Sequence, residues 1–113
     1  MHELSIASDL SEIVLNTAAR EKLSRVTVVN VSLGRLVQIV PDIFEIAFSA
    51  AVKDTAAQDA EINIEIIPVR LSCRSCSSEF GLDEDFFTCK VCGSSDINII
   101  NGKELFIKSI EGE

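Results

Sequence analysis

The stretch 73-CRSCSSEFGLDEDFFTCKVC-92 contains all four cysteines of this 113-residue chain. They form two CxxC pairs, Cys73 with Cys76 and Cys89 with Cys92, and twelve residues separate the pairs. Each CxxC turn can present two sulfurs to one ion, and two such turns supply the four thiolates of a structural Zn²⁺ site. The alternatives are weaker, because a redox CxxC does not normally occur as a matched pair and two disulfides require an oxidising compartment.

The segment around these cysteines has only a thin apolar core of its own. Its large apolar side chains are Phe80, Leu82, Phe86, Phe87 and Ile97. A core of that size does not stabilise a segment this short, so metal binding is expected to supply the missing folding free energy. We therefore expect residues 71–100 to be a zinc ribbon inserted into a larger domain.

Charge argues against nucleic-acid binding by this ribbon. Residues 71–100 carry two basic side chains, Arg74 and Lys90, against five acidic ones. The whole chain has a net charge of −8, which repels phosphates, so nucleic acid is not expected as a partner. The ribbon is better suited to a structural role or to contact with another protein.

Periodic patterns on both sides of the ribbon predict the larger domain. Apolar residues recur at helical spacing from Leu4 to about Lys22, namely Ile6, Leu10, Ile13, Val14 and Ala18. A second helical stripe follows Pro41 and Asp42, made of Phe44, Ala47, Phe48 and Ala51. Alternating apolar residues predict three strands, at 24–34, at 60–71 and at 103–111.

The predicted order of these elements defines a fold class. The fold class is α+β, with two helices on one face of a three-stranded mixed sheet and a zinc-ribbon subdomain inserted before the last strand. Residues 1–70 plus 101–113 are expected to form the larger domain, and residues 71–100 the ribbon. No apolar run is long enough to span a bilayer, and the start lacks the features of a signal peptide, so a cytoplasmic protein is expected.

The chain starts with MHELS, and its one histidine is residue 2. Methionine aminopeptidase requires a small second residue, so Met1 is expected to be retained in front of His2. The α-amino group, the next amide nitrogens and the imidazole could then converge on one ion, and nitrogen-rich ligation suits Ni²⁺ or Cu²⁺. The plainer interpretation is a solvated histidine followed by Glu3, an acid that suits a helix N-terminus.

Three features together resemble the HypA/HybF family of hydrogenase nickel-insertion proteins. They are the MHELS start, the stretch SLGRLVQIVPDIFEIAF at 32–48 and the paired CxxC motifs before a last strand. The resemblance covers essentially the whole chain. One departure is Lys90, where many members have proline directly after the third cysteine, and this loosens one turn without affecting a ligand.

The resemblance implies a nickel metallochaperone that is not an enzyme. It assigns nickel to Met1 (through its amine), His2 and Glu3. It assigns structural zinc to the four cysteines, Cys73, Cys76, Cys89 and Cys92. The implied partners are the accessory GTPase of hydrogenase maturation and the precursor of the hydrogenase large subunit; some members also serve urease maturation.

Two other classes are weighed against the nickel chaperone. One is an acidic zinc-ribbon module that docks a partner protein and transfers no nickel. The other is a redox or hydrolytic enzyme, which a single histidine and the lack of a nucleophile elbow or phosphate loop disfavour. The sequence leaves the oligomeric state open, including a homodimer.

Overall fold

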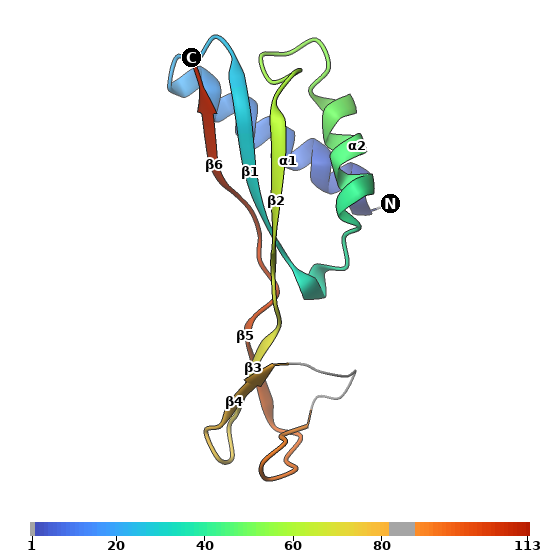
Figure 1. Cartoon of the computed structure of the whole chain (residues 1–113), viewed down its shortest axis with the longest axis vertical. Helices are drawn as coiled ribbons and strands as arrows, with labels where there is room; N and C mark the ends of the chain where they lie inside the picture. The colour runs from blue at the N-terminus through green and yellow to red at the C-terminus, as the bar shows by residue number, and fades with distance from the viewer. Residues whose placement is uncertain (1, 82–87) are drawn as a thin grey trace.

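The computed structural model describes residues 3–81 and 88–113 in full and, for His2, the backbone. The described elements are α1 (His2–Arg20), β1 (Val26–Gly34), the 3₁₀ turn η1 (Arg35–Val37), α2 (Pro41–Ala51), β2 (Glu61–Ile67), β3 (Arg70–Cys73), β4 (Glu79–Gly81), β5 (Ile97–Asn101) and β6 (Leu105–Gly112). They form two three-stranded sheets, one at each end of an elongated molecule (Figure 1).

The larger sheet has the order β2-β1-β6 and is mixed, as expected. β1 pairs with β2 in parallel, with Val29 opposite Ile62, and with β6 antiparallel, with Val29 opposite Ile110. A parallel pair requires a crossover, which α2 supplies between β1 and β2. The two helices and the mixed sheet confirm the predicted α+β class.

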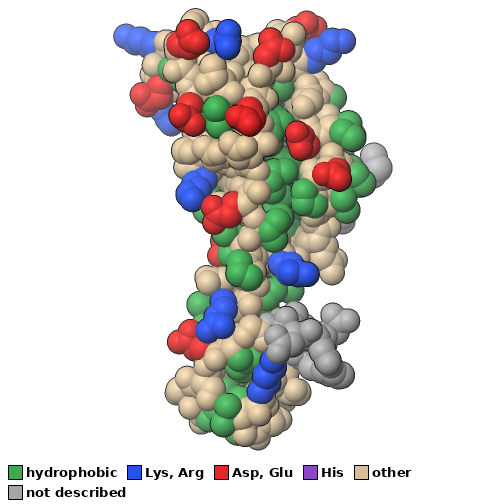
Figure 2. Space-filling view, in the orientation of Figure 1, with side chains coloured by type: hydrophobic (Ala, Val, Ile, Leu, Met, Phe, Trp, Pro, Cys, Tyr) green, Lys and Arg blue, Asp and Glu red, His purple; other side chains and the backbone are tan. Residues whose placement is uncertain are grey.

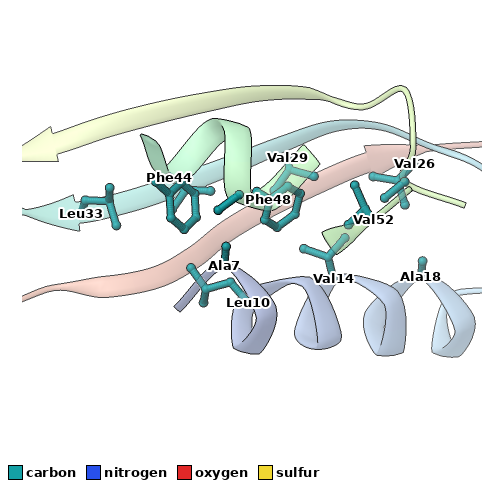
Figure 3. Close-up of a cluster of buried hydrophobic side chains, with 13 residues drawn as sticks. Ala7, Leu10, Val14, Ala18, Val26, Val29, Leu33, Phe44, Phe48 and Val52 are labelled. Carbon is teal, nitrogen blue, oxygen red and sulfur yellow. The ribbon is translucent and has the colours of Figure 1, made fainter. Parts of the chain in front are cut away.

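Both helices cover the same face of this sheet, and the core lies between the two layers (Figure 3). It contains thirteen buried residues: Ala7, Leu10, Val14, Ala18, Val26, Val29, Val31, Leu33, Phe44, Ala47, Phe48, Val52 and Ala57. Phe44 and Phe48 are its largest members, with ring centroids 6.0 Å apart. The helical stripes are thus largely confirmed.

The prediction is wrong for two residues of the apolar stripes, which are exposed. Ile13 is 49% exposed, because it lies about 60° of helical rotation from Leu10 and about 100° from Val14, beyond the edge of the buried side. Ala51 is exposed at the last residue of α2, and Val52 continues the core in its place.

The strand predicted at 60–71 is divided into two strands in different sheets. β2 ends at Ile67 and β3 begins at Arg70, with Pro68 between them. Proline has no N–H to donate to a ladder, so pairing stops there and the chain passes from one sheet to the other. The last predicted strand is confirmed as β6.

A close backbone contact joins the two sheets. The N–H of Gly34 donates to the carbonyl of Glu104 at 2.6 Å, and the N–H of Leu36 donates to the carbonyl of Gly102 at 2.8 Å. A Cβ on Gly34 would lie 2.2 Å from the Gly102 oxygen. Glycine is therefore required at position 34 by the approach of two backbone segments.

In the described part of the chain, neither helix combines the length and the hydropathy that crossing a bilayer requires.

Candidate metal centre

The first cysteine pair lies in a tight turn that follows β3. The N–H of Cys73 donates to the carbonyl of Ser78 at 2.8 Å, and the N–H of Ser77 donates to the carbonyl of Cys73 at 2.9 Å. Ser77 has a φ of 65°, the left-handed conformation that reverses the chain after Cys76. The turn thereby presents both sulfurs on the same side.

The second pair repeats this turn. The N–H of Cys89 donates to the carbonyl of Ser94 at 2.8 Å, and the N–H of Gly93 donates to the carbonyl of Cys89 at 2.9 Å. Gly93 has a φ of 73°, so it occupies the position that Ser77 holds in the first turn. The N–H groups of Val91 and Cys92 point at Cys89 Sγ, at 3.3 and 3.4 Å. Such N–H groups stabilise a thiolate.

The two turns bring the four sulfurs into one cluster. All four Sγ atoms lie within 4.8 Å of one another, and Cys73–Cys92 and Cys76–Cys89 are each 3.5 Å apart. A tetrahedron with Zn–S bonds of about 2.3 Å has edges of about 3.8 Å, so this donor set fits a zinc ion. None of the four cysteines forms a disulfide in this structure, and the cluster is the arrangement expected for the metal-site alternative.

The local hydrogen bonds favour thiolates unequally. The hydroxyl of Ser78, 3.2 Å from Cys76 Sγ, together with the Ser78 N–H, lowers the pKa of Cys76 to about 6. The backbone N–H of Cys76 lowers the pKa of Cys73. The N–H of Ser94 acts to lower the pKa of Cys92, but neighbouring sulfurs and desolvation outweigh it and raise that pKa to about 12. Four thiolates this close together therefore need a bound cation to be stable as a set.

Polar contacts outside the cluster connect the two turns. Arg74 Nη1 lies 3.3 Å from Asp96 Oδ1, and the Arg74 N–H donates to the Asp96 carbonyl at 3.0 Å. The hydroxyls of Ser75 and Ser94 are 3.0 Å apart. Sequence reasoning counted Arg74 and Asp96 only as charges, and it did not single out Ser75, Ser78 or Ser94. The recurrence of serine in CRSCSS and CKVCGS is nevertheless a signal that the two turns are alike.

The core predicted for this segment is only partly described. Phe80 and Ile97 are half-buried, whereas Leu82, Phe86 and Phe87 lie outside the described residues. Leu71, which was not singled out, is fully buried in β3.

The predicted nickel motif lies in another part of the molecule. Met1 and the side chain of His2 lie outside the described residues. Glu3 is half-buried in the first turn of α1, and its Oε1 accepts a hydrogen bond from the N–H of Val40 at 3.5 Å. The structure thus places the start of α1 against the residue that precedes α2, whereas the cysteine turns extend from the small sheet, away from the helices (Figure 1). Sequence alone gave no sign of the contact between Glu3 and Val40.

Comparison with known proteins matches this arrangement. Residues 1–112 match the family model described as "Hydrogenase/urease nickel incorporation, metallochaperone, hypA". The chain belongs to the HypA family. The resemblance identified from the sequence is confirmed, and the family model describes a metallochaperone.

HypA relatives share both the sequence and the fold. A protein of Desulfitobacterium hafniense named hydrogenase maturation factor HypA is 37% identical over 113 residues, which cover 100% of this chain and 99% of that protein. One of Moorella thermoacetica with the same name is 34% identical over the full length of both chains.

Solved HypA structures resemble this one closely. A HypA solution structure has a TM-score of 0.76 at 27% identity and covers 100% of this chain and 97% of its own. The solution structure of the Ni metallochaperone HypA from Helicobacter pylori has a TM-score of 0.71 at 26% identity, with coverage of 97% and 96%.

Proposed function

We propose that this protein carries Ni²⁺ on its N-terminal motif and delivers it to the precursor of the hydrogenase large subunit during [NiFe]-hydrogenase maturation. The observation that carries the proposal is the HypA family match over residues 1–112, which includes both the Met1-His2-Glu3 motif and the four cysteines. The family description also names urease, so urease is a second candidate acceptor of the nickel.

Nickel is the cargo in this proposal, and its ligands come from the chain start. The amine of Met1, the imidazole of His2 and amide nitrogens up to Glu3 form the ligand set. The first N–H groups of a helix have no acceptor within the helix, so nickel can use these amides of α1 without breaking helical hydrogen bonds. The Glu3 carboxylate is turned towards Val40, which favours a role for Glu3 through its backbone nitrogen.

The four cysteines would hold a structural Zn²⁺ ion. Four cysteine ligands would link the two CxxC turns through the ion and would leave no coordination position open for catalysis. The cysteines themselves orient the turns, and the N–H groups at Cys89 Sγ stabilise its charged form. Zinc is assigned a folding role and nickel a transfer role.

Several finer assignments follow from the same proposal. Residues 1–70 plus 101–113 would act as the nickel-binding domain and residues 71–100 as the zinc-ribbon domain, a division supported by the two separate sheets. The partners would be the GTPase of hydrogenase maturation and the large-subunit precursor, in the cytoplasm, and a homodimer is a further assembly to test. The competing function is a zinc-ribbon interaction module that transfers no nickel.

Metal analysis of the untagged protein separates these two functions. The protein starting at Met1 should contain one zinc as purified and should bind one nickel in equilibrium dialysis. His2→Ala should lose the nickel and keep the zinc. The matched control is Glu12→Gln, an exposed acid on the same helix, which should keep both metals. A native protein that holds zinc but binds no nickel would establish the interaction module instead.

A further inference from the structure

The connection between β5 and β6 contains an Asn-Gly pair. Figure 2 shows that the molecule narrows between its two sheets, and this connection crosses the narrow part (Figure 1). Asn101 is the last residue of β5 and is exposed, whereas Gly102 is buried. Asn-Gly is the dipeptide most prone to ring closure, because glycine has no side chain to hinder attack by its nitrogen on the asparagine amide. A chemically reactive pair therefore lies at the junction of the two sheets.

The fold itself requires glycine at position 102. Gly102 has a φ of 119°, which residues with a side chain rarely adopt. A Cβ at this position would also lie 3.2 Å from the Cα of Val69. The carbonyl of Gly102 accepts the N–H of Leu36 at 2.8 Å, which ties the residue to the large domain. Packing at the junction therefore keeps an unhindered nitrogen directly after Asn101.

A carboxylate faces this nitrogen. The N–H of Gly102 donates to Oε1 of the half-buried Glu104 at 2.6 Å. A general base has to lie within about 2.6–3.2 Å of the atom whose proton it removes, and the Gly102 nitrogen is the atom that loses a proton when it attacks. The backbone of Glu104 is held from a second side, because its carbonyl accepts the N–H of Gly34 at 2.6 Å. Glu104 is thus positioned to activate the nitrogen.

We propose that Asn101 is a site of self-catalysed deamidation, with Glu104 as the general base. The Gly102 nitrogen attacks Cγ of Asn101, and its proton passes to the Glu104 carboxylate. The new C–N bond closes a five-membered succinimide, and the side-chain nitrogen leaves as ammonia with the proton that Glu104 returns. Water then opens either carbonyl of the ring and gives an aspartyl or an isoaspartyl residue. The net reaction consumes one water and releases one ammonia.

Both products change the junction between the sheets. Each adds a carboxylate at position 101, which pairs with Arg70 across the small sheet. The isoaspartyl product also lengthens the main chain by one carbon, directly before the carbonyl that accepts the N–H of Leu36. We expect this product to weaken the contact between the two sheets. The inference is independent of the proposed nickel function, because it depends only on groups at this junction.

Peptide mapping of the aged protein tests the site. The zinc-loaded full chain is kept at physiological temperature and pH, sampled over days and digested with trypsin. Cleavage after Lys90 and Lys103 releases residues 91–103, and tandem mass spectrometry distinguishes asparagine, aspartate and isoaspartate in this peptide. Asn98 in the same peptide is the internal control, because it is also exposed but precedes the β-branched Ile99. Asn101 should convert and Asn98 should stay intact.

Two variants test the role of Glu104. Glu104→Gln keeps an acceptor for the Gly102 N–H but removes the base, so it should slow conversion of Asn101 in the folded protein roughly tenfold or more. Glu111→Gln changes an exposed acid on β6 and should leave the rate unchanged. In urea with a chelator, all three proteins should convert at the same rate, because Glu104 is no longer held against Gly102. Circular dichroism and zinc content establish that each variant is folded.

Two results would overturn the proposal. If Asn101 stays intact in the folded protein while the chain in urea converts, the fold protects the pair instead of activating it. If folded Glu104→Gln converts as fast as the unmodified protein, the carboxylate is not the base. The comparison of Asn101 with Asn98 uses the unmodified protein alone, so it decides the site whether or not Glu104→Gln folds.

Discussion

Removing one cysteine should unfold the small sheet and leave the helical domain folded. The change is Cys89→Ser, which replaces one of the four thiolates with a hydroxyl and leaves a weaker, incomplete set of ligands. Binding of a structural zinc contributes about 10–16 kcal/mol to the folding of small zinc modules. In the described part of residues 71–100, Leu71 is the one fully buried aliphatic side chain, and its burial contributes about 1.5–3 kcal/mol. Apolar burial among the described residues of this segment therefore does not replace the metal.

The helices should survive because their core is separate. All thirteen residues of the large core lie between Ala7 and Ala57, and none comes from β3, β4 or β5. α1 and α2, with 19 and 11 residues, supply seven of these core residues: Ala7, Leu10, Val14, Ala18, Phe44, Ala47 and Phe48. Cys89→Ser should thus keep its helical circular dichroism.

Two measurements check this prediction together. Trypsin should cleave the Cys89→Ser protein rapidly after Arg74 and Lys90 in the exposed turns, and far-ultraviolet circular dichroism should retain the helical signal. Ser95→Ala, a change in the same loop that touches no ligand, should keep zinc and resist trypsin. Loss of the helical signal in Cys89→Ser would refute the separation of the two cores. Resistance to trypsin without bound metal would refute the dependence of the small sheet on zinc.

Three further predictions concern the chain start and the junction between the sheets. A Gly-Ser extension ahead of Met1 converts the amine into an amide, so nickel affinity measured by calorimetry should fall by orders of magnitude. Glu3→Gln should reduce nickel affinity less. An extended protein with native nickel affinity would exclude the amine as a ligand. Nickel affinity should rise with pH, because the α-amino group and the imidazole, whose reference pKa values in model peptides are about 8 and about 6.5, must be neutral to bind. Calorimetry showing equal affinity at mildly acidic and mildly alkaline pH would contradict this ligand set. Gly34→Ala should lower the free energy of unfolding in urea by about 1–3 kcal/mol, since its Cβ meets the Gly102 backbone at 2.2 Å, whereas Gly81→Ala, with 3.7 Å of clearance, should have little effect.

Local patterns determined most of the secondary structure. Helices and strands were predictable because burial on one side imposes a period of 3.6 or 2 on the sequence, as in Leu10, Val14 and Ala18. The cysteine spacing was equally informative, because a CxxC turn closes within six residues and needs no distant contact. The Met1-His2-Glu3 motif is local for the same reason, and it stays a prediction.

Tertiary structure decided what depends on residues distant in the sequence. The division of the predicted strand at Pro68 follows from which strands each half pairs with, and the run of alternating residues does not contain that information. The sulfur of Cys73 approaches that of Cys92, and the sulfur of Cys76 approaches that of Cys89, only because two separate turns meet.

The surroundings of the proposed nickel motif also came only from the tertiary structure. Glu3 and Val40 are 37 residues apart, and packing of α1 against α2 brings the carboxylate to the N–H. Periodicity showed which side of α2 faces the core, but it did not show that Val40, the residue before this helix, lies against Glu3. A one-dimensional pattern records whether each residue is buried, and only the fold determines which exposed residues become neighbours.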